Sequence, residues 1–203
     1  MVGQAMNRTA KYKLLYCSAL ILLLAAAVLA AVLLGGGAYA WVVVVVLLLV
    51  PGRVQGHYYR ELFTARKLLD EGRHAESIPY GERFLAQARN SPWIKRLIWL
   101  SWTVYTPDAE AMALNNLGAA HLELGRFDRA ASAFEDALEL DPEYAIPYYN
   151  LALLRAAQDD EGGAARLLRR AQDLGYRRTN VDQLIGQAQS LLARLEGRGV
   201  PAD

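Results

Sequence analysis

A run of 37 residues without a charged side chain, from Leu14 to Val50, limits what this chain can fold into more than any other feature. As one straight helix the run would be about 55 Å long, whereas the hydrocarbon core of a bilayer is about 30 Å thick. One ordinary membrane-spanning helix would therefore leave a large surplus. The length favours two crossings, and one long or tilted crossing is the alternative.

Three consecutive glycines, Gly35–Gly37, divide this run where a tight turn would be needed. The first part, Leu14–Leu34, has 21 residues and is long enough for one crossing. The second part, Ala38–Val50, has only 13 residues. It can continue through Pro51 and Gly52 to Val54, because a span tolerates Pro and Gly where neighbouring groups satisfy the backbone. The long stem of Arg53 lets its charge reach the headgroups. We predict a transmembrane hairpin over residues 14–54.

The charges on either side of the run indicate the side of the membrane. The basic segment 1–13 contains Arg8, Lys11 and Lys13 and no acidic residue, and the run is followed by further basic residues, namely Arg53, Arg60, Arg66 and Lys67. By the positive-inside tendency both flanks of a hairpin face the cytoplasm. We therefore expect an integral membrane protein with residues 55–203 in the cytoplasm. A single-pass anchor would instead place that domain outside the cytoplasm.

The remainder of the chain is balanced in charge and has the composition of a helical domain. Residues 53–203 contain all 21 acidic and 19 of the 22 basic residues, so no concentrated basic surface points to nucleic acid. Some 150 residues suffice for one domain with a sizeable core. The segment is rich in Ala, Leu, Glu, Gln and Arg, which favour helices. We predict an all-α protein.

A 34-residue period appears in this domain. Large and small residues recur at matching offsets in two windows, as the pairs Leu114/Tyr148, Leu117/Leu151, Gly118/Ala152, His121/Arg155, Ala130/Ala164, Phe134/Leu168 and Ala137/Ala171 show. Each window holds two amphipathic stretches separated by a turn. The small residues remove bulk where two helices approach closely, and Phe134 or Leu168 fills the space beside them. Such a helix pair cannot bury its own apolar face, so neighbouring pairs stack.

The segment 111–144 resembles the tetratricopeptide repeat family, with Gly118, Ala130, Phe134, Ala137 and Pro142 at the characteristic positions. Its departures are Leu114 for the usual Trp and His121 for the usual Tyr. A second unit occupies 145–178, and a degenerate one occupies 58–91. The resemblance implies an α-solenoid of helix-turn-helix repeats. Together with the uncharged run before it, this leads us to expect a membrane-anchored, bacterial-type member of the family, in a bacterial inner membrane.

An amphipathic helix is predicted after the last repeat, over 179–196. Thr179 followed by Asp182 is a capping pattern. Its apolar stripe consists of Val181, Leu184, Ile185, Ala188, Leu191, Leu192 and Leu195. An open helical stack needs such a cap for solubility.

An insertion of about 19 residues, 91–109, separates the first unit from the second and holds three of the four tryptophans. Ser91 and Pro92 are a good helix start. We leave three interpretations open. The segment is an extra helix buried in the stack, an interfacial helix on the membrane, or a docking surface for a membrane partner. The candidate contact residues are Trp93, Ile94, Lys95, Arg96, Trp99, Trp102 and Tyr105.

Members of this family usually bind a peptide or helix along the concave face formed by the first helix of each unit. The resemblance assigns that role to Met112, Asn115, Ala119, Leu122, Glu123, Ile146, Tyr149 and Leu153. This face is mostly apolar, which suits an amphipathic helix or the protein's own tryptophan-rich segment. A structural hydrogen-bonding role is predicted for Asn116 and Asn150, which recur at the same offset.

No catalytic or metal-binding motif is recognisable. The three histidines, His57, His74 and His121, are scattered, and there is no metal-ligand spacing, phosphate-binding glycine loop or nucleophile motif. We expect no catalytic residues and no cofactor. The predicted function is a membrane-anchored scaffold or adaptor that contacts another protein and the bilayer but not nucleic acid. The alternative is an integral accessory subunit of a larger membrane complex.

Overall fold

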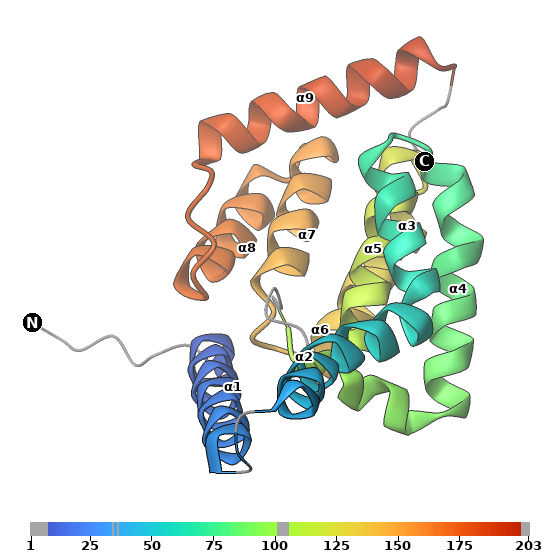
Figure 1. The fold of residues 1–203 in the computed structure, drawn as a ribbon. Coiled ribbons are helices and arrows are strands. Elements are labelled where there is room, and N and C mark those ends of the chain that lie inside the picture. Colours follow the sequence, from blue (N-terminus) through green and yellow to red (C-terminus); the bar gives the residue numbers. More distant parts are fainter. Residues whose placement is uncertain (1–7, 34, 36, 101–105, 200–203) are drawn as a thin grey trace, which may run out of the picture.

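A computed structural model describes residues 8–33, 35, 37–100 and 106–199 of the chain, and all regular structure in these residues is helical (Figure 1). This agrees with the all-α prediction. The elements follow in the order α1 (Arg8–Leu33), α2 (Ala38–Tyr58), α3 (Arg60–Asp70), α4 (His74–Asn90), the 3₁₀ helix η1 (Pro92–Leu100), α5 (Ala109–Glu123), α6 (Phe127–Leu140), α7 (Ala145–Ala157), α8 (Glu161–Asp173) and α9 (Val181–Gly197).

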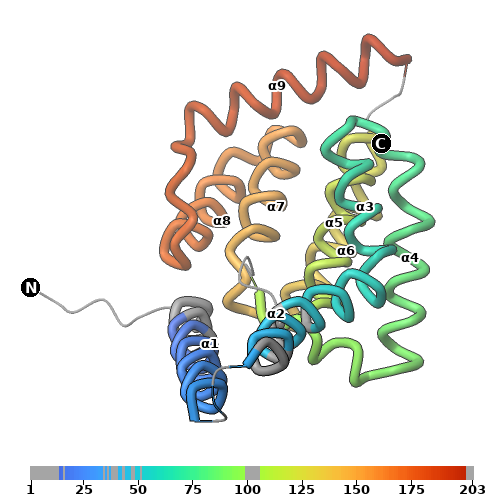
Figure 2. Tube along the Cα trace, viewed as in Figure 1, coloured from blue at the N-terminus to red at the C-terminus, as the bar shows by residue number. Residues whose placement is uncertain are grey.

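The first two helices form a pair joined by a glycine turn. Gly35 has a φ of 88°, and its amide donates to the carbonyl of Val32 at 3.1 Å. Helix α2 continues through Pro51 and Gly52 to Tyr58 without interruption. The two helices contact each other, and most of their described apolar side chains are exposed. Figure 2 shows the pair at the end of the molecule away from α9.

Within the described residues, no helix reaches the combined length and hydropathy needed to cross a membrane. The predicted hairpin over 14–54 is therefore present as a pair of helices. Its crossing of a bilayer is not supported by this finding and stays a prediction.

The next six helices form three antiparallel pairs, α3 with α4, α5 with α6, and α7 with α8. Each pair also contacts the next, through α4 with α5 and α6 with α7. This is the arrangement expected of an α-solenoid. The pairs lie within the predicted units 58–91, 111–144 and 145–178, except that α5 begins two residues before its unit, at Ala109.

The same turn joins the two helices of every pair. Gly72, Gly125 and Asp159 occupy it with φ values of 74°, 72° and 60°. In each turn the next amide donates to a carbonyl five residues earlier, at 2.8 to 2.9 Å. This left-handed ending satisfies the last carbonyls of the first helix, and glycine adopts it without strain. The third pair uses an aspartate where the first two use glycine.

Two close contacts between helices explain small residues in the sequence. A Cβ atom on Gly118 would lie 2.5 Å from the ring of Phe134, so the absent side chain lets α5 and α6 approach. This confirms the predicted role of Gly118. At Gly81, where the degenerate unit lacks a large residue, a Cβ would lie 2.8 Å from the side chain of Leu117. A residue of the next unit therefore fills the space that the first unit leaves.

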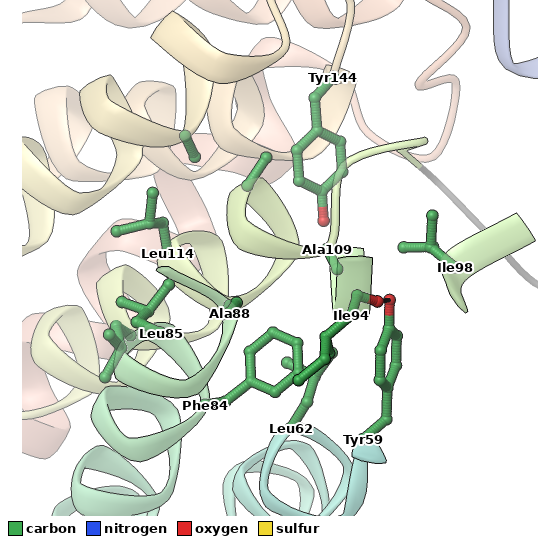
Figure 3. Packing of buried hydrophobic residues seen from close by; sticks show 14 residues of the cluster. Tyr59, Leu62, Phe84, Leu85, Ala88, Ile94, Ile98, Ala109, Leu114 and Tyr144 are labelled. Carbon is green, nitrogen blue, oxygen red and sulfur yellow. Dashed lines mark hydrogen bonds between the residues drawn. The ribbon is translucent and has the colours of Figure 1, made fainter. Parts of the chain in front are cut away.

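The largest apolar cluster lies between the first two pairs and the insertion. Tyr59, Leu62, Phe84, Ile94 and Leu114 belong to it and are buried. Figure 3 shows the side chains of Leu62, Phe84 and Ile94 converging beside Tyr59. The insertion therefore contributes directly to the core of the repeats.

The helix predicted after the last repeat is present as α9, with a different start. Its N-cap is Asn180, which forms a capping box with Gln183, whereas Thr179 is buried and its carbonyl accepts from Gln172 at 2.9 Å. The helix lies mainly along α7 and touches α8 only slightly. In Figure 1 it crosses one end of α7 and extends toward the C-terminal end of α5.

Candidate functional site: the inner surface of α5 and α7

The eight predicted partner-binding residues lie on two first helices, five on α5 and three on α7. The two helices are in contact, so these residues share one inner surface. Helix α9 covers one end of it. The other end adjoins the cluster that includes η1.

The covered end is apolar. Leu122 is buried in one cluster with Ala188, Leu191 and Leu195 of α9. Ala119 and Leu153 are partly buried and pack against the same cluster. Leu153 also packs against the neighbouring cluster, in which Leu184 is fully buried. Three residues of one face of α9, Ala188, Leu191 and Leu195, therefore share a cluster with the predicted binding residue Leu122. Leu184 of the same face lies in the cluster that Leu153 borders, together with residues of α7 and α8.

Polar contacts join α9 to the same surface. The hydroxyl of Tyr149 donates to Oε1 of Gln187 at 2.6 Å. Arg194 donates to both carboxylate oxygens of Glu123 at 3.1 Å, and Arg198 donates to the carbonyl of Glu123 at 3.3 Å. Glu123 and Tyr149 are both residues that the sequence assigned to partner binding. In this structure both are engaged by α9.

Tyr149 also stacks on Tyr176, a residue of the segment between α8 and α9. Their ring centroids are 4.5 Å apart and the rings are inclined by 24°. Burial, followed by the nearby Tyr176, raises the pKa of Tyr149 to about 12. A tyrosine hydroxyl is already protonated in the physiological range at its ordinary pKa, so Tyr149 can donate to Gln187.

The opposite end of the surface has a different character. Met112 and Ile146 are half-buried and pack against the large cluster of the first two pairs. Asn115 is buried and accepts from Nδ2 of Asn150 at 2.9 Å. This bond joins α5 to α7, which confirms the structural role predicted for Asn150. Asn115, predicted as a binding residue, has its side-chain oxygen engaged in the same bond.

The insertion packs against the repeats through one face. Ile94 and Ile98 are both 2% exposed. Tyr59 donates to the carbonyls of Ile94 and Lys95 at 3.1 and 3.3 Å, and Gln55 of α2 donates to the carbonyl of Leu97 at 3.2 Å. These bonds hold η1 against the end of α2. The interpretation of an internally packed segment therefore applies to this face, although the segment is a 3₁₀ helix over Pro92–Leu100.

The other face of η1 is open. Trp93 is 48% exposed and meets the ring of Tyr58 edge-on at 4.7 Å, and Arg96 is exposed. The side chain of Trp99 and all of Trp102 and Tyr105 lie outside what the structure describes. Among the candidate contact residues of this segment, Trp93 and Arg96 are described and exposed, so they can meet a membrane or a partner.

Glu110 is a buried acid that the sequence interpretation did not single out. Its carboxylate accepts from Nε of Arg89 at 2.8 Å and from the ammonium of Lys95, so it joins α4, η1 and α5. Burial acts to raise its pKa, but the bonds from Lys95 and Arg89 outweigh this and hold the pKa below its usual value. Asp108, which caps α5 two residues earlier, gave the only sequence signal, because acids are favoured in a first helical turn.

A second buried polar contact lies nearby. The hydroxyl of Thr106 donates to Asp141 at 2.6 Å, and both residues are buried. The bond ties the segment before α5 to the residue after α6. It fixes the end of the insertion to the second pair.

Among the residues that the structure describes, no group of three or more His, Cys, Asp and Glu side chains is placed to hold a metal ion. His74 and His121 each have a buried Nδ1 for which the described residues provide no partner. Burial first, and then nearby arginines, lower the pKa of both rings, and at His74 this outweighs the opposing effect of Glu123 at 4.0 Å.

Residues 111–144, which form α5, α6 and their flanking turns, match the family described as Tetratricopeptide repeat. This segment is a tetratricopeptide repeat. The matched residues include Gly118 and Phe134, which are in contact, and the glycine turn at Gly125. The tetratricopeptide repeat contributes five of the eight inner-surface residues.

The human protein called Tetratricopeptide repeat protein 36 is 36% identical to this chain over 89 residues. The aligned part covers 44% of this chain and 47% of the human protein, so the chain spans about half the length of this relative. Tetratricopeptide repeats generally serve as scaffolds for contacts between proteins. The two comparisons do not confirm the membrane anchor or the bacterial origin expected from the sequence.

Proposed function

We propose that the protein is a membrane-held scaffold whose repeats bind an amphipathic helix of another protein on the inner surface of α5 and α7. The observation that carries the binding proposal is the shape and chemistry of this surface, which already accommodates the apolar face of a helix. A groove of this kind binds a helix through apolar residues that recur about once per turn along one face of that helix.

The membrane part of the proposal rests on the uncharged run and on the exposure of its side chains. In α1, Leu22 and Leu33 are 70% and 77% exposed, and in α2 Leu49 is 62% exposed. In the repeats, by contrast, large exposed apolar residues are few. Monomeric soluble proteins rarely expose contiguous apolar patches of more than a few hundred Å². A bilayer would cover this surface, and the basic flanks would place the repeats on the cytoplasmic side of a bacterial inner membrane.

An accessory subunit of a larger membrane complex is the second candidate. It is favoured by Trp93 and Phe63, which are 48% and 47% exposed although they lie next to the main cluster. Exposed aromatic residues of this kind are typical of protein interfaces. In this case another subunit, rather than lipid, covers part of α1, α2 and η1.

Extraction of cell membranes at alkaline pH tests the anchor. The full chain should remain in the membrane pellet, whereas a double substitution Leu22→Lys and Val45→Lys should move it to the supernatant, because charges at the centre of a span are costly. Leu140→Lys on α6 is the matched control, since Leu140 is 41% exposed and lies in the repeats. Release of the unaltered chain would refute membrane anchoring.

A pair of reporters, active on only one side of the membrane, tests the orientation. Fused after Gly36, the reporters should signal the outer side, and fused after Asp203 they should signal the cytoplasm. An outer signal from both positions would replace the hairpin by a single-pass anchor, with the repeats outside the cytoplasm. Gentle solubilisation then separates the two candidate functions, because an accessory subunit should purify in one fixed assembly.

A further inference from the structure

We propose that α9 is an intramolecular occupant of the partner-binding surface, and that the partner is an amphipathic helix that repeats the pattern of α9 and displaces it. This inference rests on the proposed function. It adds the chemical identity of the ligand and the way in which access to the surface is controlled.

The first support is where α9 lies. Its fully buried face rests on α5 and α7, and its polar contacts are made with Glu123 and Tyr149. These partners lie 38 to 75 positions away in the sequence. Helix α8 adds Ala164 and Leu168 to the cluster around Leu184, whereas Ala188, Leu191 and Leu195 cluster with residues of α5, α6 and α7. A helix supplied by another chain would meet the same surface in the same way.

The second support is that α9 is built to form a helix without the repeats. Asn180 accepts from the amide of Gln183 at 2.8 Å, and Gln183 accepts from the amide of Asn180 at 3.1 Å. This capping box is formed by residues close together in the sequence, so it persists when α9 leaves the inner surface of α5 and α7. Tyr176 stacks on Tyr149, and the carbonyl of Thr179 accepts from Gln172, so these contacts of the segment between α8 and α9 end just before the capping box.

The spacing of the buried residues of α9 predicts which residues the partner helix should contain. The anchors are Leu184, Ala188, Leu191 and Leu195, which recur at intervals of four, three and four residues along one face. A small residue occupies the second position. An arginine directly before the last anchor meets Glu123. The predicted partner is thus an amphipathic helix with apolar anchors at these intervals and a basic residue near its C-terminal end.

Binding of a peptide that copies α9 tests this proposal in the full chain, held in detergent micelles. The probe is a fluorescein-labelled peptide of residues 179–198, followed by fluorescence anisotropy. In the chain, Leu191→Asp places a charge in the buried seat and should release α9. Peptide affinity should then rise by about tenfold or more over that of the unaltered chain, because chains with an uncovered inner surface are no longer a minor fraction of the molecules.

The matched control is Ala193→Asp, which introduces the same charge on the exposed face of the same helix. It should bind the peptide as weakly as the unaltered chain does. Hydrogen exchange shows whether Leu191→Asp releases α9 alone. If it also deprotects α3–α8, the pair Arg194→Glu and Arg198→Glu replaces it, since both residues are exposed and their loss leaves the apolar core intact.

The register of the partner is tested by exchanging charges. Glu123→Arg in the Leu191→Asp chain should weaken binding of the peptide, and Arg194→Glu in the peptide should restore it. Restoration would place the peptide in the seat of α9. Equal binding with and without the exchange would refute this register.

Three results would overturn the proposal, and they are distinguishable. Equal peptide binding to the unaltered and released chains would show that α9 does not control access, and the proposed scaffold function would stand. Release of α9 without peptide binding would show that the surface accepts no helix from another chain, which also removes the binding part of the proposed function. A dimer that forms with rising concentration only when Leu191 is intact would identify a second copy as the occupant. None of these outcomes depends on the membrane anchor.

Discussion

The second and third helix pairs follow the same 34-residue plan but fill the space between their helices differently. In the second pair, Gly118 lets the ring of Phe134 lie against the α5 backbone. In the third pair the same positions hold Ala152 and Leu168, both buried. A larger side chain on one helix is balanced by a smaller one on the other. The comparison teaches that the volume of the contact is shared, so either residue can be understood only together with its partner.

Removing the larger member should have the greatest effect. Phe134→Ala should lower the free energy of unfolding by about 3–5 kcal/mol, and Leu168→Ala by about 2–5 kcal/mol, because each leaves a cavity at a fully buried site. Chemical denaturation followed by circular dichroism measures both. A loss near zero at either position would mean that the neighbouring helices close the cavity. Glu135→Ala and Arg169→Ala, at exposed positions one residue further along α6 and α8, serve as controls.

Converting the second pair into the third gives a sharper test. Gly118→Ala should cost about 1–3 kcal/mol through overpacking against Phe134, although alanine favours a helix. With Phe134→Leu added, the total loss should be smaller than the sum of the two single losses, because leucine makes room for the new methyl group. A double-mutant cycle of the free energies of unfolding measures this coupling. Strict additivity would contradict the shared volume.

The two pairs should also differ in their response to pH. His121 of the second pair corresponds to Arg155 of the third, and arginine keeps its charge in this range. Burial, followed by Arg126 and Arg129, lowers the pKa of His121. Below pH 6.5 the unfolded chain therefore takes up a proton before the folded chain does, and stability falls as the pH decreases toward the folded pKa.

Thermal unfolding between pH 5 and 7.5 measures this effect, which should be smaller than that of Gly118→Ala. His121→Gln should flatten the profile because the substituted side chain does not titrate. His74, whose pKa is also lowered by burial, provides a second and separable contribution. An unchanged profile in the His121→Gln variant would show that this ring does not contribute.

Exchanging the turn residues should have the smallest effect. Gly125→Asp should lower the free energy of unfolding by roughly 1 kcal/mol, since aspartate tolerates a left-handed backbone less well than glycine does. Asp159→Gly should raise it by less than about 1 kcal/mol, because the relief of strain is offset by the greater freedom of glycine in the unfolded chain. Thermal melts of the two variants should therefore shift in opposite directions.

The sequence predicted those features that are repeated or local. The helix pairs follow from the 34-residue period, and the close approach at Gly118 follows from the family pattern. The continuous path of α2 through Pro51 was also anticipated. In each case the determining residues are near one another in the sequence or recur at a fixed interval.

Features that depend on distant contacts were not predictable in the same way. The amphipathic stripe of α9 was visible, but its seat depends on Glu123 and Tyr149, far earlier in the chain. Burial of Glu110 depends on Arg89 and Lys95 from two other elements. The buried Thr106 and Asp141 pair likewise joins residues 35 positions apart. A repeat period or an apolar stripe in the sequence indicates which face of a helix is apolar. It does not indicate which other surface covers that face.

The position of η1 between α2 and α5 also has a mechanical consequence. Tyr59 and Gln55 bind η1 at the end of α2, and Lys95 binds Glu110 at the start of α5. Tension applied along α2 therefore reaches the second pair by two parallel routes, through the covalent chain of α3 and α4 and directly across η1. Two attachments that share a force resist it better than a single attachment does. The repeats would keep their alignment under a force that could peel away a singly attached domain.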